Sequence, residues 1–562
     1  MGAGLVRELS FTQFFSDFVV SFLALFLFFP LIHVLREGFF TRQGFTLDFF
    51  FAIFRNPTTR TGIINSLVLA LLTTLATFLI TLPLAWLTVR TSFRGKVLLA
   101  GLLLLPLVLP PFVGAIGMRR LLARFGTLNM ALMNAGVMDS PIDWLGNNKF
   151  WGVLILQTLH LFPIMYLNVV SSLANIDPSL EEAGKNMGAS PFTVLRRITL
   201  PLAAPGIFAG SAIVFIWALT DLGTPLVFEY REVIPVLIFD RISDMGENPE
   251  GYALVVMVLL MTLSTYFLSK RLFGGTGQAM LTKNLSQSRE RVLKGTEAFF
   301  ARSLFLVVIF LSVLPHLSVL LTSVADRWFM TALPASYTTA HFREALAHEL
   351  TVPSMANSIF YASVATAVDL FLGVILAWLV TRSKRAEAKY LDMLAMLPLA
   401  LPGIVVAFGY VAAFHHTVLD PRRDPAMLLI IAYSVRRLPY VLRAAYAGFS
   451  QVSESLEEAA LNLGATPART LRRITLPLIG ANLLAGGILA FTFALLEVSD
   501  SLILALKTNS FPITKAIYTL LGRVDDGLAL ACALGVWSML FLGTSLLLAN
   551  SILGKKMGEL FR

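Results

Sequence analysis

The sequence predicts an all-α polytopic membrane protein built as two homologous halves of six membrane-spanning helices each. Hydrophobic residues make up 56% of the chain and charged residues only 14%, with a mean hydropathy of +0.76. Soluble proteins usually carry about 25% charged residues. The apolar residues gather in runs of roughly 20, the length that a helix needs to cross a ~30 Å hydrocarbon core. The runs of the first half also recur in the second.

The apolar runs are long and continuous, which favours helices over the alternating strands of a membrane barrel. The first run follows Arg7 and resembles the core of a signal peptide. No small-residue cleavage site follows it, so we interpret it as a retained helix. The twelve predicted spans are residues 18–35, 63–89, 97–116, 150–171, 201–219, 252–269, 302–324, 357–380, 390–414, 426–448, 480–496 and 528–550.

The distribution of basic residues predicts that both termini are cytoplasmic. Twelve spans place the two ends on one side, and the loops on that side carry the modest excess of Lys and Arg that marks the cytoplasmic face. The net charge of +10 therefore indicates membrane topology. No basic face with interleaved aromatic residues occurs, so the sequence gives no support for nucleic-acid binding. Cys532 is the single cysteine, which excludes intramolecular disulfides and cysteine-based metal sites.

The chain contains an internal repeat. Asn65-Ser66 recurs as Asn357-Ser358, and Ala85-Trp86-Leu87 recurs as Ala377-Trp378-Leu379, both 292 residues later. Arg90 and Arg382 follow these tripeptides in each copy. Further along, the string LRRITLPL occurs at 195–202 and again at 471–478, an offset of 276. Because the copies share one orientation, this is a parallel repeat, which favours a pathway between the two halves.

The repeat sets the predicted domain boundaries. The first half covers 1–275, a cytoplasmic linker covers 276–300, and the second half covers 301–562. The linker is polar and basic, and contact with anionic lipid is an alternative to a simple connection. The change of offset places an insertion in the outer loop from Arg119 to Lys149. Its segment 129–133 predicts a short amphipathic helix, either a contact for an external protein or ordinary loop packing.

One loop in each half, at 177–201 and 453–477, carries the most informative motif. Both loops begin with helix-start signals and place acids in the first turn, where the helix dipole favours them. Gly188 and Gly464 are predicted either to end a short helix or to let another surface approach closely, and Pro191 and Pro467 to open a second helix. A helix, a glycine and a second helix at the membrane surface suit docking into a groove of another protein. The acids concerned are Glu181, Glu182, Glu457 and Glu458.

Both loops resemble the EAA signature of ATP-binding-cassette (ABC) importer permeases, in which E-A-A is followed by a glycine and an Ile-x-Leu-Pro. The second copy matches at 458–460, Gly464 and 474–477. The first matches at Glu182, Ala183, Gly188 and 198–201, with Gly184 in place of the second alanine. The resemblance implies the type I ABC importer permease fold. It also implies that the residues around Glu181, Ala183, Glu457 and Ala459 form a coupling helix in each half.

The resemblance further implies the partners. The chain has no GxxxxGK[ST] phosphate-binding loop, so it is predicted to lack ATPase activity and to hold no cofactor of its own. ATP and magnesium would be bound by a homodimeric ATPase on the cytoplasmic side. A periplasmic or lipid-anchored binding protein would deliver the solute. The chain would lie in the bacterial inner membrane, surrounded by lipid, and would work by alternating access.

Charged residues deep in the spans are candidates for the pathway, because polar groups there are expensive to bury. Arg436 and Arg437 lie in the tenth span, and His160 is the repeat equivalent of Arg436. The arginines either face the pathway or pair with acids at the ends of the fifth and eleventh spans. Those acids are Asp221, Glu497 and Asp500.

Two further patterns complete the candidates. His415 and His416 are adjacent at the outer end of the ninth span. Neighbouring residues do not share a helix face, so no metal site is predicted there. Pro110-Pro111 and the pair Pro398 and Pro402 predict bent or broken helices.

The resemblance favours iron(III) as the solute, because fused twelve-span permeases with two EAA loops are similar to those of iron(III) and thiamine importers. Phosphonate or polyamine import by the same mechanism remains an alternative. An ion-coupled secondary transporter is the alternative class, but it gives no reason for paired EAA loops.

Overall fold

The computed structural model describes residues 2–41, 44–146, 149–242, 249–273, 290–382, 388–524 and 526–553. It confirms the predicted fold class. Nine helices among these residues are long and apolar enough to cross a membrane, and twelve spans result if each of three bent helix pairs counts as one. Most of the predicted linker at 276–300 lies outside the described residues, as does the Gly-Gly-Thr-Gly segment at 274–277 that precedes and overlaps its start.

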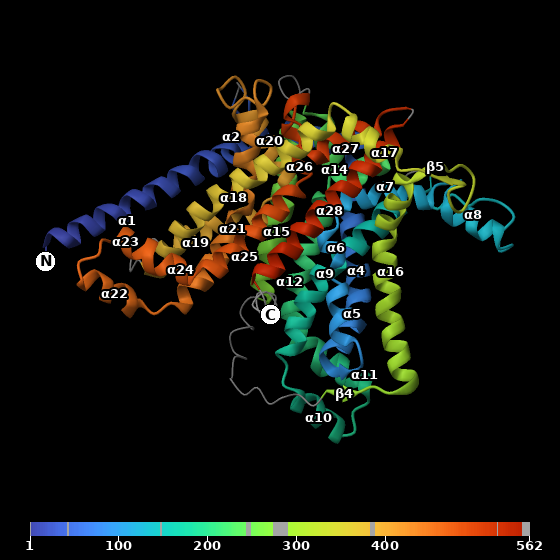
Figure 1. Ribbon diagram of the computed structural model, residues 1–562, viewed down its shortest axis with the longest axis horizontal. Helices are drawn as coiled ribbons and strands as arrows, with labels where there is room; N and C mark the ends of the chain where they lie inside the picture. Colours follow the sequence, from blue (N-terminus) through green and yellow to red (C-terminus); the bar gives the residue numbers. More distant parts are fainter. Residues whose placement is uncertain are drawn as a thin grey trace.

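The first half is a bundle of helices that also contains the short strands β1, β2 and β3 (Figure 1). Its elements are α1 (Gly2–Leu23), η1 (Ala24–Phe28), α2 (Phe29–Phe39), β1 (Phe40–Thr41), β2 (Gly44–Phe45), α3 (Asp48–Arg55), α4 (Pro57–Arg90), β3 (Thr91–Ser92), α5 (Lys96–Leu102), α6 (Leu105–Val108), α7 (Pro111–Leu122), α8 (Thr127–Asn134), α9 (Phe150–Ala174), α10 (Pro178–Asn186), α11 (Pro191–Val194), η2 (Leu195–Thr199), α12 (Leu200–Thr220), α13 (Gly223–Phe228), α14 (Ile234–Asp240) and α15 (Glu250–Phe273).

The second half repeats this order. Its elements are β4 (Arg291–Val292), α16 (Gly295–Ser323), β5 (Ala325–Arg327), β6 (Ser336–Tyr337), α17 (Ala340–Ala347), α18 (Thr351–Arg382), α19 (Ala388–Met396), η3 (Leu397–Ala400), α20 (Gly403–Ala413), α21 (Pro425–Gln451), α22 (Glu454–Asn462), α23 (Pro467–Thr470), η4 (Leu471–Thr475), α24 (Leu476–Leu478), α25 (Gly480–Leu495), α26 (Ser499–Leu504), η5 (Thr508–Ser510), α27 (Ile513–Leu521) and α28 (Gly527–Leu553). β1 pairs with β2 and β5 with β6 in antiparallel fashion, whereas β3 and β4 are parallel.

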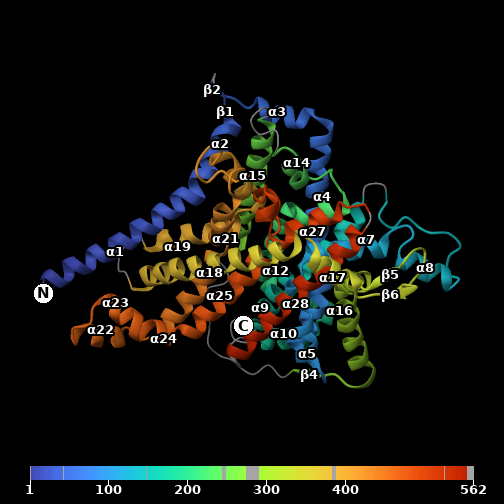
Figure 2. The ribbon, with the colours of Figure 1, turned by 45° about the horizontal axis from the view of Figure 1, so that its top comes forward.

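The first helix of each half packs on the other half. The continuous helix α1–η1–α2 runs beside α18 and α20 (Figure 2). The Tyr410 hydroxyl of α20 donates to the Phe26 carbonyl at 2.7 Å. In return, α16 packs along α5, α7 and α9, and the rings of Phe93 and Phe305 meet at 5.7 Å between centroids. This exchange ties the two halves together through buried apolar surface.

The predicted proline breaks are present. The helices on either side of Pro110-Pro111 meet at 94°, and those on either side of Pro402 meet at 101°. Proline removes a backbone donor and clashes with the preceding turn, so a helix cannot continue straight through such a segment. A third bend of 77° separates Leu478 from Gly480. The sequence had predicted no bend there, and the matching helix α12 of the first half continues without one.

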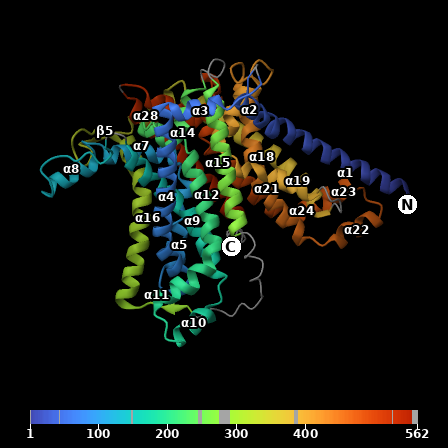
Figure 3. The same ribbon diagram turned by 180° about the vertical axis from the view of Figure 1, so that it is seen from behind.

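The remaining spans follow the predicted runs. α8 forms within the predicted outer loop, as the amphipathic pattern had indicated. α10 and α22 lie at one end of the long helices, while α8, β5 and α17 lie at the other end (Figures 1 and 3). The two predicted surface loops are therefore on one side of the molecule, and the inserted loop of the first half is on the opposite side.

Candidate functional site

The two surface loops share one construction. α10 and α22 are each nine residues long and start from a capping side chain, Asp177 or Ser453, that accepts an N–H from two residues ahead. This cap satisfies one of the free donors at a helix start. The backbone N–H and the hydroxyl of Ser179 hold the pKa of Asp177 below its usual value. Each helix is followed by a turn and then by a second helix that opens with proline.

A glycine with left-handed backbone ends each first helix. Gly188 has a φ of +85° and Gly464 a φ of +87°. A Cβ at either position would meet no atom within 4 Å, so the backbone conformation, rather than crowding, is what requires glycine. The prediction that these glycines terminate the helices is confirmed by their dihedral angles.

The first glutamate of each repeated Glu-Glu pair is held by an arginine from the end of a long helix. The Arg382 Nε lies 2.9 Å from a Glu457 carboxylate oxygen, and the Arg90 Nε lies 3.2 Å from Glu181. The Arg382 guanidinium also donates to the carbonyl of Val452 at 2.9 Å, which joins the loop's start to the same anchor. Charge-assisted hydrogen bonds of this kind are roughly twice as strong as neutral ones.

A threonine completes each anchor. Thr199 donates to Glu181 and Thr475 donates to Glu457, both at 2.8 Å. These threonines belong to η2 and η4, the one-turn π-helices formed by the identical LRRIT segments. A π-turn widens the helix and re-aims its side chains, and such turns are frequent at functional sites. Sequence reasoning noted the repeated arginines and the repeated string but did not assign them this role.

The outward faces of the two loops are exposed and partly apolar. Glu182, Ala183, Glu458 and Ala459 are all exposed on the outer sides of α10 and α22. The side chains just before the two glycines stand almost free, with Met187 83% exposed and Leu463 89% exposed. Apolar side chains projecting from an anchored helix are typical of a docking surface.

Gly184, which departs from the EAA pattern, has a packing reason. A Cβ at Gly184 would lie 2.7 Å from the Ile198 side chain, whereas the matching Ala460 is buried without such a clash. The first loop therefore packs more closely on η2 than the second loop does on η4. The sequence had predicted only a lower helix propensity at this position.

The deep charged residues of the second half form one network. The Arg436 guanidinium lies 2.6 Å from Glu497 and 3.1 Å from Asp500. Arg437 also pairs with Glu497. The side chains are nearly inaccessible, with Asp500 at 0% and Glu497 at 6% exposure. Two arginines thus face two acids inside the protein, which is the pairing alternative of the sequence analysis.

Glycine makes room for this network. A Cβ on Gly403 would lie 2.4 Å from an Arg436 guanidinium nitrogen. The guanidinium therefore rests against the start of α20, directly at the helix break. Close approach of a side chain to the backbone is a position where only glycine fits.

Among its described residues, the first half carries no matching ion network: His160 stands at the position of Arg436, and Asp221 at that of Glu497. His160 contacts the backbone at Pro106, and the neighbouring His316 lies 3.2 Å from the Pro110 carbonyl through its Nε2. Both imidazoles thus reach the backbone freed by the helix break. Asp221 accepts from Gln157 at 3.1 Å and from the N–H groups of Gly223 and Thr224 at 3.1 and 3.3 Å, so it satisfies donors in the first turn of α13. The structure brings Arg436, Arg437, Glu497 and Asp500 together, while His160 and Asp221 occupy the matching places of the other half.

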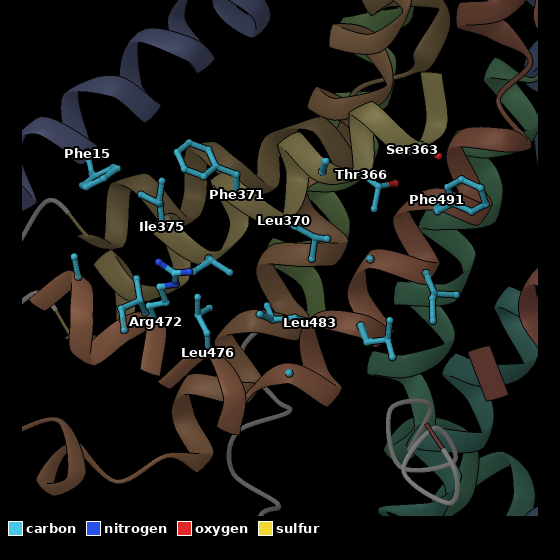
Figure 4. Close-up of a pocket in the computed structure, with 18 of the residues that line it drawn as sticks. Phe15, Ser363, Thr366, Leu370, Phe371, Ile375, Arg472, Leu476, Leu483 and Phe491 are labelled. Atoms are coloured by element: carbon cyan, nitrogen blue, oxygen red, sulfur yellow. The ribbon is translucent and has the colours of Figure 1, made fainter. Parts of the chain in front are cut away.

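An apolar cavity of about 1120 Å³ lies between α1, α18 and the helices from α23 to α25 (Figure 4). Phe15, Leu370, Phe371 and Leu476 line it, and Arg472 reaches it from η4. A lining of this composition does not solvate an ion, so it is unsuited to a charged solute. Its position beside the membrane-spanning surface instead suits hydrocarbon chains.

These observations define a two-half membrane permease with a pair of matched surface loops. The comparison with protein families places it more narrowly. The model of the binding-protein-dependent transport system inner membrane component matches residues 64–275 and again 369–556. The chain belongs to this family and carries its domain twice.

Known relatives match over both halves or over one. A ferric transport system permease protein of Actinobacillus pleuropneumoniae is 28% identical over 443 residues, covering 78% of this chain and 62% of the relative. A Haemophilus influenzae protein named as a ferric transport permease is 28% identical over 414 residues, covering 73% of this chain and 64% of the relative. The chain thus spans less than two thirds of the length of these two proteins. The molybdenum transport permease of Haemophilus influenzae is 30% identical over 228 residues, covering 38% of this chain and 97% of the relative.

Among solved structures, a bacterial ABC transporter involved in alginate import matches with a TM-score of 0.37 at 14% identity. The match covers 46% of this chain and 98% of that one.

Proposed function

We propose that this chain is the permease subunit of an ABC importer and that it moves iron(III) into the cytoplasm. One observation carries the proposal. The two repeats each present an anchored helix, with a left-handed glycine and a free apolar side chain, on the same side of the molecule. Two identical docking points are what a homodimeric partner requires.

The partner on that side is a separate homodimeric ATPase, which binds the ATP and magnesium. α10 and α22 each fit into one ATPase protomer, and the Arg–Glu anchors pass the movement of that protomer to α4 and α18. Because each anchor joins the loop to the last turn of a long helix, a shift of the loop becomes a shift of the span. The chain itself supplies no phosphate-binding loop for hydrolysis.

The solute arrives from the opposite side, delivered by an extracytoplasmic binding protein. The inserted outer loop with α8 is a contact surface for this protein. Both termini then lie in the cytoplasm, and the chain is multi-pass in the bacterial inner membrane. Lipid chains fill the apolar cavity beside α18. The gating cycle is alternating access, in which each ligand must bind one state better than the other.

Iron(III) is favoured over the alternatives by the extent of the relatives. The two relatives named for ferric transport match 73% and 78% of the chain, across both halves. The spermidine/putrescine permease of Escherichia coli matches only 36%. Thiamine, phosphonate and polyamine remain the alternative solutes, and the ligand retained by the partner binding protein identifies the solute.

The test of coupling is Gly464→Asp in the assembled transporter. An aspartate at a φ of +87° strains the turn and places a charge on the docking face. We expect solute uptake to fall at least tenfold while the partner continues to hydrolyse ATP. Gly44→Asp is the matched control, since Gly44 also has a positive φ, +120°, and open space, and it lies in β2, outside both surface loops and the inserted outer loop.

Normal uptake by the Gly464→Asp variant would contradict the docking assignment. Uptake without an ATPase would favour the alternative class of protein. If the purified chain alone, without any ATPase, accumulates solute in vesicles under a proton gradient, the protein is an ion-coupled secondary transporter.

A further inference from the structure

The segment between α20 and α21 gathers three potential metal ligands. Candidate ligand atoms of His415, His416 and Asp420 all lie within 4.8 Å of one another. The two imidazole rings are 3.7 Å apart between centroids. Within the described residues, no other cluster of three such side chains meets this limit. The segment lies at the end of the molecule opposite α10 and α22 (Figure 1).

The backbone explains why adjacent histidines converge here. α20 ends at Ala413, so the two residues are not on a helix, and His416 has a left-handed φ of 60°. The sequence analysis had assumed helical spacing, which would have separated the two rings. That assumption is wrong at this position. A left-handed conformation is uncommon for a residue other than glycine and is sustained only by surrounding contacts.

Asp420 supplies those contacts. One of its carboxylate oxygens accepts the His416 N–H and the other accepts the Arg422 N–H, both at 2.9 Å. Each oxygen keeps a further lone pair, because a carboxylate offers about four acceptor positions. The turn therefore holds the carboxylate beside the imidazoles without exhausting it as a ligand.

Arg422 is the positive charge that faces the cluster. Its guanidinium contacts the Nε2 of His415. Since a guanidinium only donates hydrogen bonds, this nitrogen presents its lone pair, which is the electron pair that a metal ion would use. Arg422 and a metal ion therefore compete for the same atom.

We propose that His415, His416 and Asp420 form a binding site for a divalent first-row transition metal ion such as Zn²⁺, with Arg422 as its competitor. Two imidazoles and one carboxylate are a ligand set that suits these ions, and three protein ligands leave a position open for water. Ligand atoms around such an ion are separated by roughly 3–4 Å, given bonds of about 2.0–2.2 Å. Small rotations of His415 and the exposed His416 close the present spacing.

The experiment is titration of the full-length chain, purified in detergent with a tag that contains no histidine, with Zn²⁺ by calorimetry. Co²⁺ absorption serves as a second probe, because its intensity reports the coordination geometry. We expect one ion per chain. His415→Ala, His416→Gly and Asp420→Asn should each weaken binding at least tenfold, whereas Arg422→Ala should tighten it.

The variants are chosen to preserve the turn. Glycine adopts the backbone of His416 without strain. Asparagine keeps an oxygen that accepts one of the two N–H groups, so Asp420→Asn loses only one of the two hydrogen bonds that the carboxylate accepts from the turn. His348→Ala and Arg523→Ala are the matched controls. The His348 Nε2 and the Arg523 guanidinium form a similar contact, 2.6 Å long, and neither residue belongs to the cluster. Equal Zn²⁺ affinity in the parent chain and the three ligand variants, or no binding at millimolar Zn²⁺, would overturn the proposal. The readout is binding, so it is independent of whether the chain imports iron(III).

Discussion

Arg90 holds Glu181 in the first half as Arg382 holds Glu457 in the second, yet the deep position of the tenth span holds Arg436 where the fourth span holds His160. The two surface loops, which we propose to dock the ATPase, have kept the same construction in both repeats. The buried polar positions have diverged: the second half holds a four-residue ion network, whereas the first half holds Asp221, which accepts N–H groups at the start of α13. Surfaces that contact two copies of one partner are constrained together, whereas each interior is constrained only by its own packing.

The largest expected effect tests the divergent interiors. Glu497→Gln leaves Arg437 without its counter-ion and weakens the pairing of Arg436. Breaking a buried ion pair costs about 3–5 kcal/mol. Asp221→Asn, the matched change, should cost only about 1 kcal/mol, because the amide oxygen still caps α13. Thermal unfolding of the two purified variants measures the difference, and equal shifts in Tm would contradict it.

The second prediction concerns the shared anchors. Arg382→Met removes the ion pair with Glu457 and the hydrogen bond to Val452. Hydrogen bonds to charged groups contribute about 1.5–3 kcal/mol, so ATP-driven uptake should fall on the order of tenfold or more. Arg90→Met should have the same effect within a factor of about three, since Arg90 makes the matching contacts, at 3.2 Å to Glu181 and 3.4 Å to the Ile176 carbonyl.

A charge exchange provides the control for the anchors. The double variant Arg382→Glu with Glu457→Arg restores opposite charges at this contact, and we expect it to recover part of the uptake. If it is as defective as the single variants, the arginine acts through something other than its pair with Glu457.

The third prediction compares the two docking faces. Met187→Asp and Leu463→Asp each place a charge on an exposed side chain, so neither should change the folded state. Loss of an interface anchor costs about 2 kcal/mol, which is about 30-fold in affinity. ATPase retention on the purified permease measures it. Val524→Asp is the control, because Val524 is 97% exposed and outside both loops. If the variant that carries both Met187→Asp and Leu463→Asp retains the ATPase as well as the parent chain does, these side chains are not part of the interface.

The smallest effect is expected when the matching residues of the two loops, Gly184 and Ala460, are exchanged. Gly184→Ala introduces a methyl group 2.7 Å from Ile198, while Ala460→Gly removes one from the matching helix. We expect each change to cost about 1 kcal/mol, the first by overpacking and the second by lost helix propensity. Adding Ile198→Val should relieve only the Gly184→Ala variant. If Ile198→Val restored stability to both the Gly184→Ala and the Ala460→Gly variants, the two loops would pack alike.

Local patterns in the sequence were enough to predict the spans, the proline breaks and the two loops. Hydrophobic length reports a span directly, and the repeated string at 195–202 and 471–478 fixed the correspondence of the halves. The anchors were beyond that reasoning because Arg90 and Glu181 are 91 residues apart in the chain. Their contact depends on how the end of α4 lies against the first turn of α10, which no local pattern contains.

Other features depended on backbone geometry that composition does not report. The bend at Gly480 and the left-handed turn at His416 both contradict a reading of uninterrupted helix. The tight packing at Gly184 is likewise a property of two surfaces, since it is set by the side chain of Ile198. The roles of the predicted pathway residues remain predictions, because burial and pairing alone do not assign a route for the solute.

The crossed placement of α1–α2 and α16 bears on how such a protein originates. The first helix of each half packs against the other half, so each half alone would expose the apolar surface that this helix covers. Two unjoined polypeptides divided between α15 and β4 would recognise each other by that mutual insertion. A single chain gives the two halves equal dosage and fixed pairing in addition to this mutual packing.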